Sequence, residues 1–364
     1  MISIPAHIES LKSYNPGKTQ AEYQKLYGFQ RTASLWNNEN NLGVPIRAVE
    51  RIQSSLSKIN LYPDPLSSEL RSKLALLNRV EAKNIVVGNG SESILNNLFK
   101  VFCAPGEEIL TCSGTFVAVY IWAQSNNNNS LKIPLSKGYS FDLEAIHASI
   151  NSKTKIIYIS NANNPTGTAI GEAELLAFAK AVPENILVII DEAYFEYSKD
   201  LMQDYPDTSR WKMNNVITLR TFSKAYGLAG VRLGYAIGEE NVIESLNKVR
   251  MTFEPSILTQ EAGIGALEDV EFLEESIKIN SEWIPRFKQV VDEKGLKQSD
   301  SKANFIMIDF EDEEKAASVT IALMKQGVFV RHLPAFGLPE CIRVSTGTPR
   351  ENEYFIEVFS GLSI

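Results

Sequence analysis

The stretch NILVIIDEAYFEY, residues 185–197, decides how the rest of the chain is interpreted. Its unbroken run of apolar, mostly β-branched residues is typical of a strand buried on both faces of a parallel sheet. The run ends abruptly at Asp191, and a carboxylate there is costly unless a cation or hydrogen-bond donors meet it. Asp191 therefore either caps the following helix or faces a polar site, which Tyr194 is placed to share.

Apolar strands and helical segments alternate on both sides of this stretch. The other strand-like runs are NIVVGN (84–89), EILTC (108–112), KIIYIS (155–160) and NVITLRT (215–221). Between them, residues 91–102 and 171–182 have helical spacing. The alternation predicts an α/β domain with a mostly parallel sheet flanked by helices, and ligands in such sheets bind outside the carboxyl ends of the strands.

The pattern changes after residue 255, where a long helical stretch leads into short strands near 304–310, 327–333 and 341–348. We therefore expect a large α/β domain at 42–255, and a smaller α+β domain built from 1–41 together with 256–364. The first forty residues should pack across the body or onto a partner subunit. The polar run SNNNNS at 125–130 predicts a solvated turn.

Composition narrows the class of protein. The 364 residues carry a net charge of -8, which argues against binding nucleic acid or an anionic membrane surface. Cys103, Cys112 and Cys341 form neither a spaced metal motif nor an even disulfide set, so we expect no metal site and a reducing compartment. The chain starts without a signal-peptide pattern and has no apolar run of about 20 residues. These features indicate a cytoplasmic enzyme.

Two turns lie at the predicted ligand-binding edge. Gly88, Asn89, Gly90 and Ser91 connect a strand to a helix, a shape that suits phosphate, although a serine-capped helix after a glycine turn has the same pattern. The turn NNPTG at 163–167 is explained by its turn-forming residues, and it also places the Asn164 amide at the same edge as Asp191.

One lysine, Lys224, stands among apolar and small residues after the strand-like run 215–221. Burial and a nearby cation, here Arg232, both favour the neutral amine, which forms Schiff bases with carbonyl compounds. Thr221 and Ser223 add hydroxyl groups beside it. A phosphate cradle, an amine for an aldehyde, a carboxylate for a ring nitrogen, and a phenol with an amide for a ring hydroxyl together indicate pyridoxal 5'-phosphate.

The chain resembles the fold-type I pyridoxal-phosphate-dependent aminotransferases of class I/II, and among them most closely the histidinol-phosphate aminotransferases. The resemblance covers nearly the whole chain and implies an aspartate-aminotransferase-like fold. It rests on YNPGK (14–18), NNENNLGVP (37–45), YPDP (62–65), GNGSES (88–93), NNPTG (163–167), DEAYFEY (191–197), TFSKAYGLAGVRLG (221–234) and LPECIRVSTGT (338–348).

The resemblance implies roles for the cofactor-binding residues. Lys224 forms the Schiff base and shuttles a proton, Asp191 pairs with the pyridine nitrogen, and Tyr194 and Asn164 bond the ring hydroxyl. Phe116 stacks on the ring. The phosphate is held by the backbone amides of Ser91 and Glu92 and by the side chains of Thr221, Ser223 and Arg232. Tyr62 reaches the phosphate of a neighbouring subunit, so the active form is a homodimer.

The resemblance also implies substrate residues. Arg343 clamps an α-carboxylate, Tyr14 and Arg331 help to bind a substrate phosphate, and Asn38 contacts the substrate. The implied reaction moves an amino group between L-histidinol phosphate and 2-oxoglutarate in two Schiff-base half-reactions, as in histidine biosynthesis.

Alternatives are an aromatic or specialised-pathway aminotransferase, a phospho-amino-acid decarboxylase on the same scaffold, and a non-enzymatic binding protein. Asn41, Gly114 and Ala162 depart from the family pattern in loops near the expected substrate.

Overall fold

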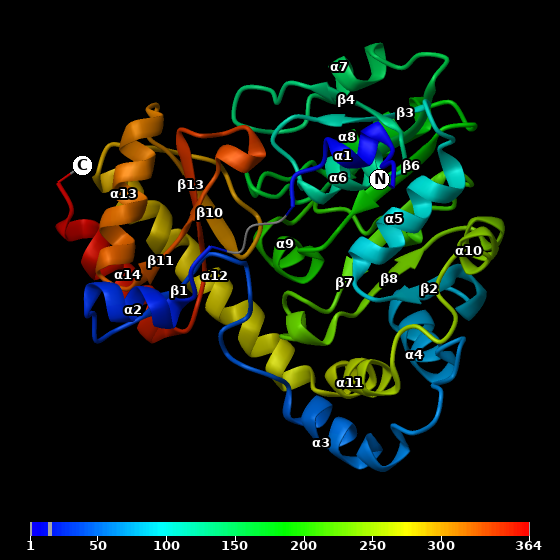
Figure 1. Cartoon of the computed structure of the whole chain (residues 1–364), viewed down its shortest axis with the longest axis horizontal. Helices are drawn as coiled ribbons and strands as arrows, with labels where there is room; N and C mark the ends of the chain where they lie inside the picture. Colours follow the sequence, from blue (N-terminus) through cyan, green and yellow to red (C-terminus); the bar gives the residue numbers. More distant parts are fainter. Residues whose placement is uncertain (1, 14–16, 364) are drawn as a thin grey trace.

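The centre of the molecule is a seven-stranded sheet with strand order β2-β8-β7-β6-β5-β3-β4 (Figure 1). The computed structural model describes residues 2–13 and 17–363. The strands are β2 (Ile85–Gly88), β3 (Glu108–Cys112), β4 (Asn129–Ile133), β5 (Thr154–Ser160), β6 (Leu187–Asp191), β7 (Val216–Thr221) and β8 (Gly234–Ile237). Among these strands, β8 alone runs in the opposite direction to the others, so the predicted mostly parallel sheet is confirmed.

Helices cover both faces of this sheet, which explains the continuous apolar runs in its strands. On β6, Ile189 packs toward one face while Val188 and Ile190 pack toward the other. The helices of the first face are α5 (Ser91–Phe102), α6 (Ala118–Ser125) and α10 (Glu240–Asn247). The second face is covered by α7 (Leu143–Ala148) and α8 (Glu172–Ala181). Because both faces are buried, apolar residues are needed at successive positions rather than at alternate ones.

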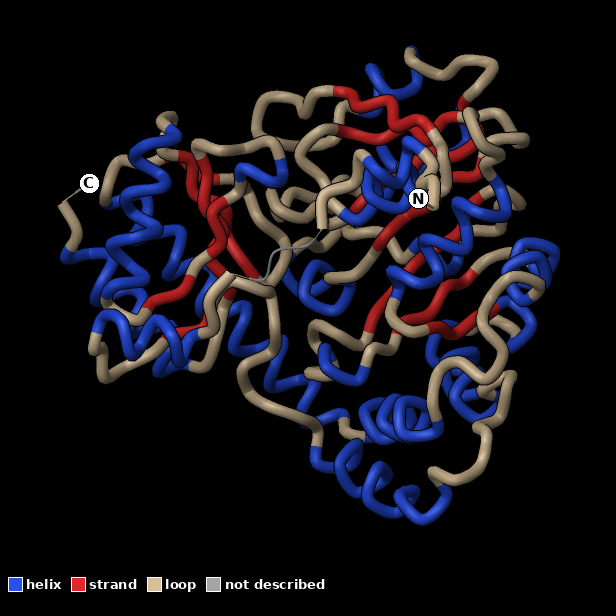
Figure 2. Tube along the Cα trace, viewed as in Figure 1, coloured by secondary structure: helices blue, strands red, loops and turns tan. Residues whose placement is uncertain are grey.

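A second, four-stranded antiparallel sheet has the order β12-β13-β10-β9. Its strands are β9 (Lys297–Gln298), β10 (Phe305–Asp309), β12 (Arg331–His332) and β13 (Cys341–Ser345). The helices α12 (Val270–Glu293), α13 (Glu313–Lys325) and α14 (Pro349–Gly361) share one apolar cluster with this sheet. Figure 2 shows this smaller sheet beside the large one, each with its own helices.

The N-terminal segment spans both parts of the molecule. α1 (Ala6–Glu9) lies against α6, where the Gln124 amide donates to the His7 carbonyl at 3.2 Å. α2 (Gln20–Tyr27) contacts α13, and β1 (Ala33–Ser34) pairs in parallel with β11 (Val328–Phe329). The expectation that the first forty residues pack across the body is therefore confirmed for the described ones.

Three further helices, α3 (Ile46–Ser55), α4 (Ser68–Asn78) and α11 (Ile257–Glu268), pack together below the large sheet (Figure 1). A Cβ at Gly265 of α11 would lie 2.5 Å from the Arg47 carbonyl oxygen, so glycine permits the close contact with α3. The sequence-based division placed α11 with the small domain, whereas its buried side chains join the cluster of β2 and β8. The domain boundaries at 41/42 and 255/256 stay a prediction.

The asparagine run departs from the sequence-based expectation. α6 ends at Ser125, and β4 already begins at Asn129. Asn128 is buried and donates to the carbonyl oxygens of Cys103 and Ala104 at 3.1 and 2.8 Å. The prediction of a solvated turn is thus wrong for the second half of the run. None of the helices in the described part of the chain is long and apolar enough to cross a membrane.

Candidate active site

A cavity of about 580 Å³ opens at the carboxyl ends of β5, β6 and β7. Its size suits a small-molecule or cofactor site. The lining includes most of the residues predicted to bind the cofactor, which come from distant parts of the chain. They are Ser91, Glu92, Phe116, Asn164, Asp191, Tyr194, Thr221, Ser223, Lys224 and Arg232.

One end of the cavity is shaped for an oxyanion. α5 begins after Gly90, which has a φ of 79°, and no described side chain caps the helix start. A Cβ at Gly90 would lie 2.7 Å from a terminal nitrogen of Arg232, and one at Gly234 would lie 2.1 Å from the Ser91 nitrogen. The glycines therefore let the guanidinium and β8 approach the helix start. Free amides, the helix dipole and a guanidinium together favour a phosphate here.

Asp191 lies at the end of β6 and is 4% exposed. The Tyr158 phenol donates to its Oδ2 at 2.8 Å, and the Ala193 amide donates to Oδ1 at 3.1 Å. Burial raises the pKa of Asp191 to about 6, while the two hydrogen bonds act in the opposite direction. A cationic partner would stabilise the ionised form of this buried carboxylate. A protonated ring nitrogen is such a partner.

The sequence did not predict the role of Tyr158. It lies on β5, opposite Ile189 of the neighbouring β6 and two residues before Ser160, which is opposite Asp191. A lone tyrosine within the apolar run IIYI was the available signal, because a buried phenol needs a hydrogen-bond partner.

The Tyr194 hydroxyl is fixed by a residue expected to bind substrate. The Asn38 amide donates to the Tyr194 oxygen at 2.8 Å, and the Ser345 hydroxyl donates to Asn38 Oδ1 at 2.8 Å. Asn38 is 2% exposed and its side chain supports Tyr194, while its neighbours Asn37 and Glu39 line the cavity. Burial raises the pKa of Tyr194 to about 12, so its hydroxyl keeps a proton to donate.

Lys224 follows β7 and extends its amine toward the centre of the cavity. Its Nζ lies 3.4 Å from the Asn37 carbonyl oxygen and 5.8 Å from the centre of the Tyr194 ring. Burial lowers the pKa of Lys224 to about 8, and Arg343 and Arg232 act in the same direction. The amine is therefore available in its neutral, nucleophilic form near physiological pH, as the sequence predicted.

The Phe116 wall of the cavity is held by the NNPTG turn. Asn163, next to Asn164, donates to the Gly114 carbonyl at 2.9 Å and accepts from the Thr115 hydroxyl at 2.8 Å. Gly114 has a φ of 70°, and a Cβ there would lie 2.8 Å from Leu135. Gly114 is thus explained by backbone geometry, and the turn positions both the aromatic wall and the Asn164 amide.

The other two departures from the family pattern also have structural explanations. The Asn41 amide donates to the Ser34 carbonyl and to Glu351, both at 3.0 Å, so it joins β1 to the start of α14. Ala162 is fully buried in a cluster with Tyr194 and Phe305. Neither side chain is part of the cavity lining.

Arg343 approaches the cavity from β13 and is 4% exposed. Its terminal nitrogens donate to Asn164 Oδ1 and, at 2.8 Å, to the Trp36 carbonyl. Its Nε has no partner among the described residues and burial lowers the pKa of Arg343 to about 10, so this site favours a bound anion. Arg331 is the cross-strand neighbour of Arg343 and donates to Asn37 Oδ1 at 2.6 Å.

Among the described residues that were predicted for the site, Tyr62 is not part of the cavity lining, and Asn38, Arg331 and Arg343 bond to residues of the lining without belonging to it. Tyr14 is outside the described residues. Tyr62 is 78% exposed and stacks on Phe253 with ring centres 4.2 Å apart. An exposed tyrosine in this position is free to contact another subunit.

Behind Asp191 lies a buried ion-pair network that the sequence did not reveal. Arg220 of β7 donates to the Glu192 carboxylate at 3.0 and 2.7 Å, to Asp207 at 2.7 Å and to Asn78 at 2.7 Å. Glu192 also accepts from the Thr208 amide and hydroxyl. Glu192 directly follows Asp191 at the end of β6, and Arg220 directly precedes Thr221 at the end of β7. The Arg220–Glu192 ion pair therefore joins the two strand ends that carry site residues.

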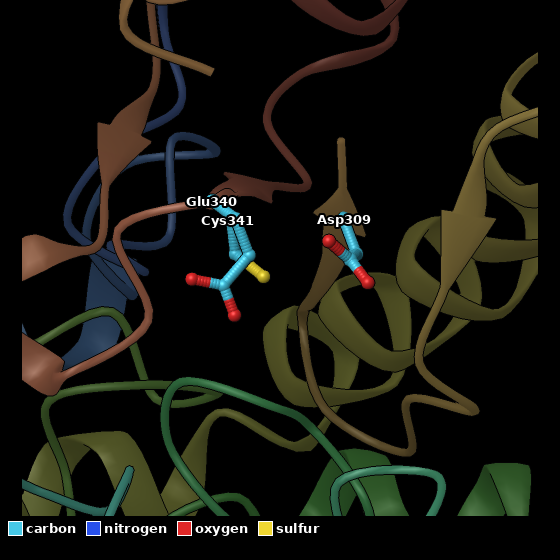
Figure 3. Close-up of side chains that lie close together, drawn as sticks. All are labelled: Asp309, Glu340 and Cys341. Atoms are coloured by element: carbon cyan, nitrogen blue, oxygen red, sulfur yellow. The ribbon is translucent and has the colours of Figure 1, made fainter. Parts of the chain in front are cut away.

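A different acidic cluster, Asp309, Glu340 and Cys341, lies on the small sheet (Figure 3). Asp309 and Cys341 are cross-strand neighbours on β10 and β13. Asp309 already accepts hydrogen bonds from the Tyr139 hydroxyl and, at 2.8 Å, from the Glu311 amide. Burial raises the pKa of the Cys341 thiol, which keeps it protonated. The contacts explain this cluster as packing between the two strands.

The family is shown by comparison with known proteins. The model of the aminotransferase class I and II family matches residues 33–359. The chain belongs to this family. Membership confirms the predicted aminotransferase activity, with a small-molecule amino donor and a keto acid as substrates, and the predicted pyridoxal 5'-phosphate cofactor.

Several aminotransferases are similar over nearly their whole length. The histidinol-phosphate aminotransferase 2 of Carboxydothermus hydrogenoformans is 38% identical over 351 residues, 96% of each chain. The histidinol-phosphate aminotransferase of Bacillus subtilis is 35% identical over 98% of this chain and 99% of its own. The crystal structure of the Sinorhizobium meliloti histidinol-phosphate aminotransferase in complex with pyridoxal-5'-phosphate has a TM-score of 0.88 at 27% identity. The match covers 99% of this chain and 98% of that one.

The fold is shared with a solved structure of lower sequence identity. A Thermus thermophilus aspartate aminotransferase has a TM-score of 0.87 at 22% identity, with 99% of each chain covered, which confirms the predicted fold.

The cavity of this aminotransferase fits its cofactor in size and chemistry. The helix start with Arg232 suits the phosphate, buried Asp191 suits the ring nitrogen, and Phe116 offers an aromatic face. The lowered pKa of Lys224 makes its neutral amine available to react with the cofactor aldehyde.

Proposed function

We propose that this aminotransferase transfers the amino group of L-histidinol phosphate to 2-oxoglutarate. The observation that carries the proposal is the pair Arg331 and Arg343, cross-strand neighbours that each hold a residue of the cavity lining. Two adjacent guanidinium groups suit substrates that alternate between a phosphate and a carboxylate. Relatives named histidinol-phosphate aminotransferase, 35–38% identical over nearly the full length, add support.

Each catalytic side chain has a defined task in this proposal. When bound, pyridoxal 5'-phosphate supplies an aldehyde that takes up the amino group and a ring that withdraws electrons from the reacting carbon. Lys224 Nζ, with its pKa of about 8, accepts and returns a proton near neutral pH. Asp191 holds a proton on the ring nitrogen, and Tyr194 and Asn164 orient the ring through its hydroxyl.

The two substrates use the arginines differently. Glutamate has an α-carboxylate, which pairs with Arg343 through the unpartnered Nε and a terminal nitrogen. Histidinol phosphate has no α-carboxylate, and its phosphate is bound by Arg331 with Tyr14. The protein alternates between these substrates in two half-reactions. Each half-reaction starts from the form of the enzyme that the other one leaves.

The active form in this proposal is a homodimer in which Tyr62 contacts the cofactor phosphate bound by the partner subunit. Support comes from exposed apolar side chains in the segments around Tyr62. They are Val44, Ile46, Leu56, Ile59, Leu61, Leu66 and Met251. Sedimentation of the holoenzyme tests the dimer, and Tyr62→Phe should weaken cofactor binding without changing the sedimentation coefficient.

Half-reactions of the holoenzyme, followed by cofactor absorbance, test the substrate. Histidinol phosphate should convert the cofactor faster than phenylalanine, and Arg331→Ala should slow histidinol phosphate far more than glutamate. Arg286→Ala, an exposed arginine of α12, is the matched control. Equal losses for both donors would refute the assignment of Arg331. Preference for phenylalanine would indicate an aromatic aminotransferase, and carbon dioxide release without a keto acid would indicate a decarboxylase.

A further inference from the structure

Glu39 is a charged residue of the cavity lining to which the cofactor assigns no role. It lines the cavity together with Lys224 and Phe116. Its carboxylate is exposed and has neither a hydrogen bond nor an ion pair within residues 2–13 and 17–363. The other two carboxylates of the lining are already hydrogen-bonded, Asp191 to Tyr158 and Glu92 to Trp122.

The backbone on both sides of Glu39 is fixed by side-chain hydrogen bonds. Asn38 is bonded to Tyr194 and Ser345, as described above. Asn40 donates to the Ala225 carbonyl at 3.0 Å and to the Ser276 hydroxyl at 2.7 Å. Since Ala225 follows Lys224, this anchor holds Glu39 beside the reacting amine. The carboxylate is therefore presented to the cavity from a rigid segment rather than from a mobile loop.

The charges around Glu39 define what it can bind. Arg343 and Arg232 lower the pKa of the Lys224 amine, whereas Glu39 raises it. The charge of Glu39 therefore acts at the end of the cavity where the amine lies. A carboxylate in this position repels a substrate phosphate or carboxylate, which the arginines attract instead. It attracts a group with N–H donors, most strongly a cationic one.

We propose that Glu39 recognises the ring N–H of an imidazole-bearing amino donor and so determines donor specificity. The inference rests on the function proposed above. The donor would then lie with its phosphate toward Arg331 and its imidazole toward Glu39, with its amino group between them near Lys224. A phenyl ring at the same place offers no N–H and leaves the carboxylate desolvated without a partner, which disfavours aromatic donors.

Single-turnover half-reactions of wild-type and Glu39→Gln holoenzyme test this specificity role. Donors are L-histidinol phosphate, L-histidine, L-phenylalanine and L-glutamate, and dissociation constants come from the donor dependence of the cofactor spectrum. Losing one charge-assisted hydrogen bond should weaken both imidazole donors by roughly 10- to 100-fold. Phenylalanine and glutamate should bind as well as before or better. Glu274→Gln, an exposed carboxylate of α12, should leave all donors unchanged.

Other outcomes would overturn the inference. An equal loss for every donor would mean that Glu39 acts on Lys224, and no loss for any donor would make it a solvated surface group. If wild-type enzyme does not use histidinol phosphate, the proposed function fails by itself. The histidine-to-phenylalanine comparison then still decides whether Glu39 recognises imidazole.

Discussion

Tyr158→Phe removes a single hydroxyl group and isolates its effect on Asp191. The phenol is fully buried and donates to Asp191 Oδ2 at 2.8 Å. A hydrogen bond to a charged group is worth about 1.5–3 kcal/mol. At about 1.4 kcal/mol per pKa unit, its loss should raise the pKa of Asp191 in the apoenzyme by about one to two units. Since that pKa is already about 6, the carboxyl of the variant should be substantially protonated at pH 7.

Cofactor affinity is the direct measure of this change. Asp191 pairs with the ring nitrogen only when the carboxylate is ionised, so Tyr158→Phe should weaken pyridoxal 5'-phosphate binding by about 2- to 10-fold at pH 7, in proportion to the lost ionised fraction. The loss should shrink as the pH rises above the new pKa of Asp191. The assay is titration of apoenzyme with the cofactor, followed by absorbance, between pH 5 and pH 9 as an approximate range.

A matched variant separates this effect from a packing defect. Tyr197 of α9 (Phe195–Leu201) is equally buried, and its hydroxyl makes no hydrogen bond within the described residues. Tyr197→Phe should therefore leave the affinity for the cofactor unchanged. If Tyr158→Phe binds the cofactor as tightly as Tyr197→Phe at every pH, the phenol does not support the charge of Asp191 and the reasoning is wrong.

Three further changes test the energetics of the site. Lys224→Met should stabilise the apoprotein by about 3 kcal/mol at pH 7, because the lowered pKa of Lys224 means that the folded state binds its proton less tightly than the unfolded state does. This gain should fall as the pH rises from about 8 and be lost above about 10.5, the pKa of an ordinary lysine. Urea unfolding of both proteins at the two ends of this pH range measures it. Gly90→Ala should lower cofactor affinity because its Cβ would displace the Arg232 guanidinium, whereas Gly106→Ala, with a φ of 87° and open space, should affect stability alone. Arg220→Met leaves the Glu192 carboxylate buried without its cation and should cost about 3–5 kcal/mol of unfolding free energy, and a loss below about 1 kcal/mol would contradict the importance of the network.

The large sheet was predictable because its strands are buried on both faces, so their sequences are continuous apolar runs. β8 was missed because it is a short antiparallel strand bounded by Gly234 and Gly238, and its pattern resembles a loop. Residues at the carboxyl ends of β6 and β7 were predictable because the topology of a parallel sheet brings such ends together. Asp191 and Lys224 are examples.

The supporting residues were not predictable, since their roles depend on contacts between distant segments. Asn38 and Tyr194 are 156 residues apart, and Arg220 and Asn78 are 142 residues apart. A buried asparagine or arginine has no periodic pattern that distinguishes it from an exposed one. The sequence therefore locates the groups that react, while the structure shows which residues hold them.

The two reacting groups illustrate why this support is needed. Burial moves the pKa of Asp191 up to about 6 and that of Lys224 down to about 8, so each is shifted toward its neutral form. Such shifts persist only if neighbouring elements keep water and counter-ions from relaxing the site. The Arg220–Glu192 pair fixes the residue after Asp191, and the Asn40 amide fixes the backbone of Ala225 after Lys224. The free energy of folding that is lost at these two positions is regained when a ligand with a cationic ring nitrogen and an aldehyde binds. Because Asp191 is mostly ionised at pH 7 and mostly protonated at pH 5, cofactor binding should stabilise the fold more at pH 7 than at pH 5.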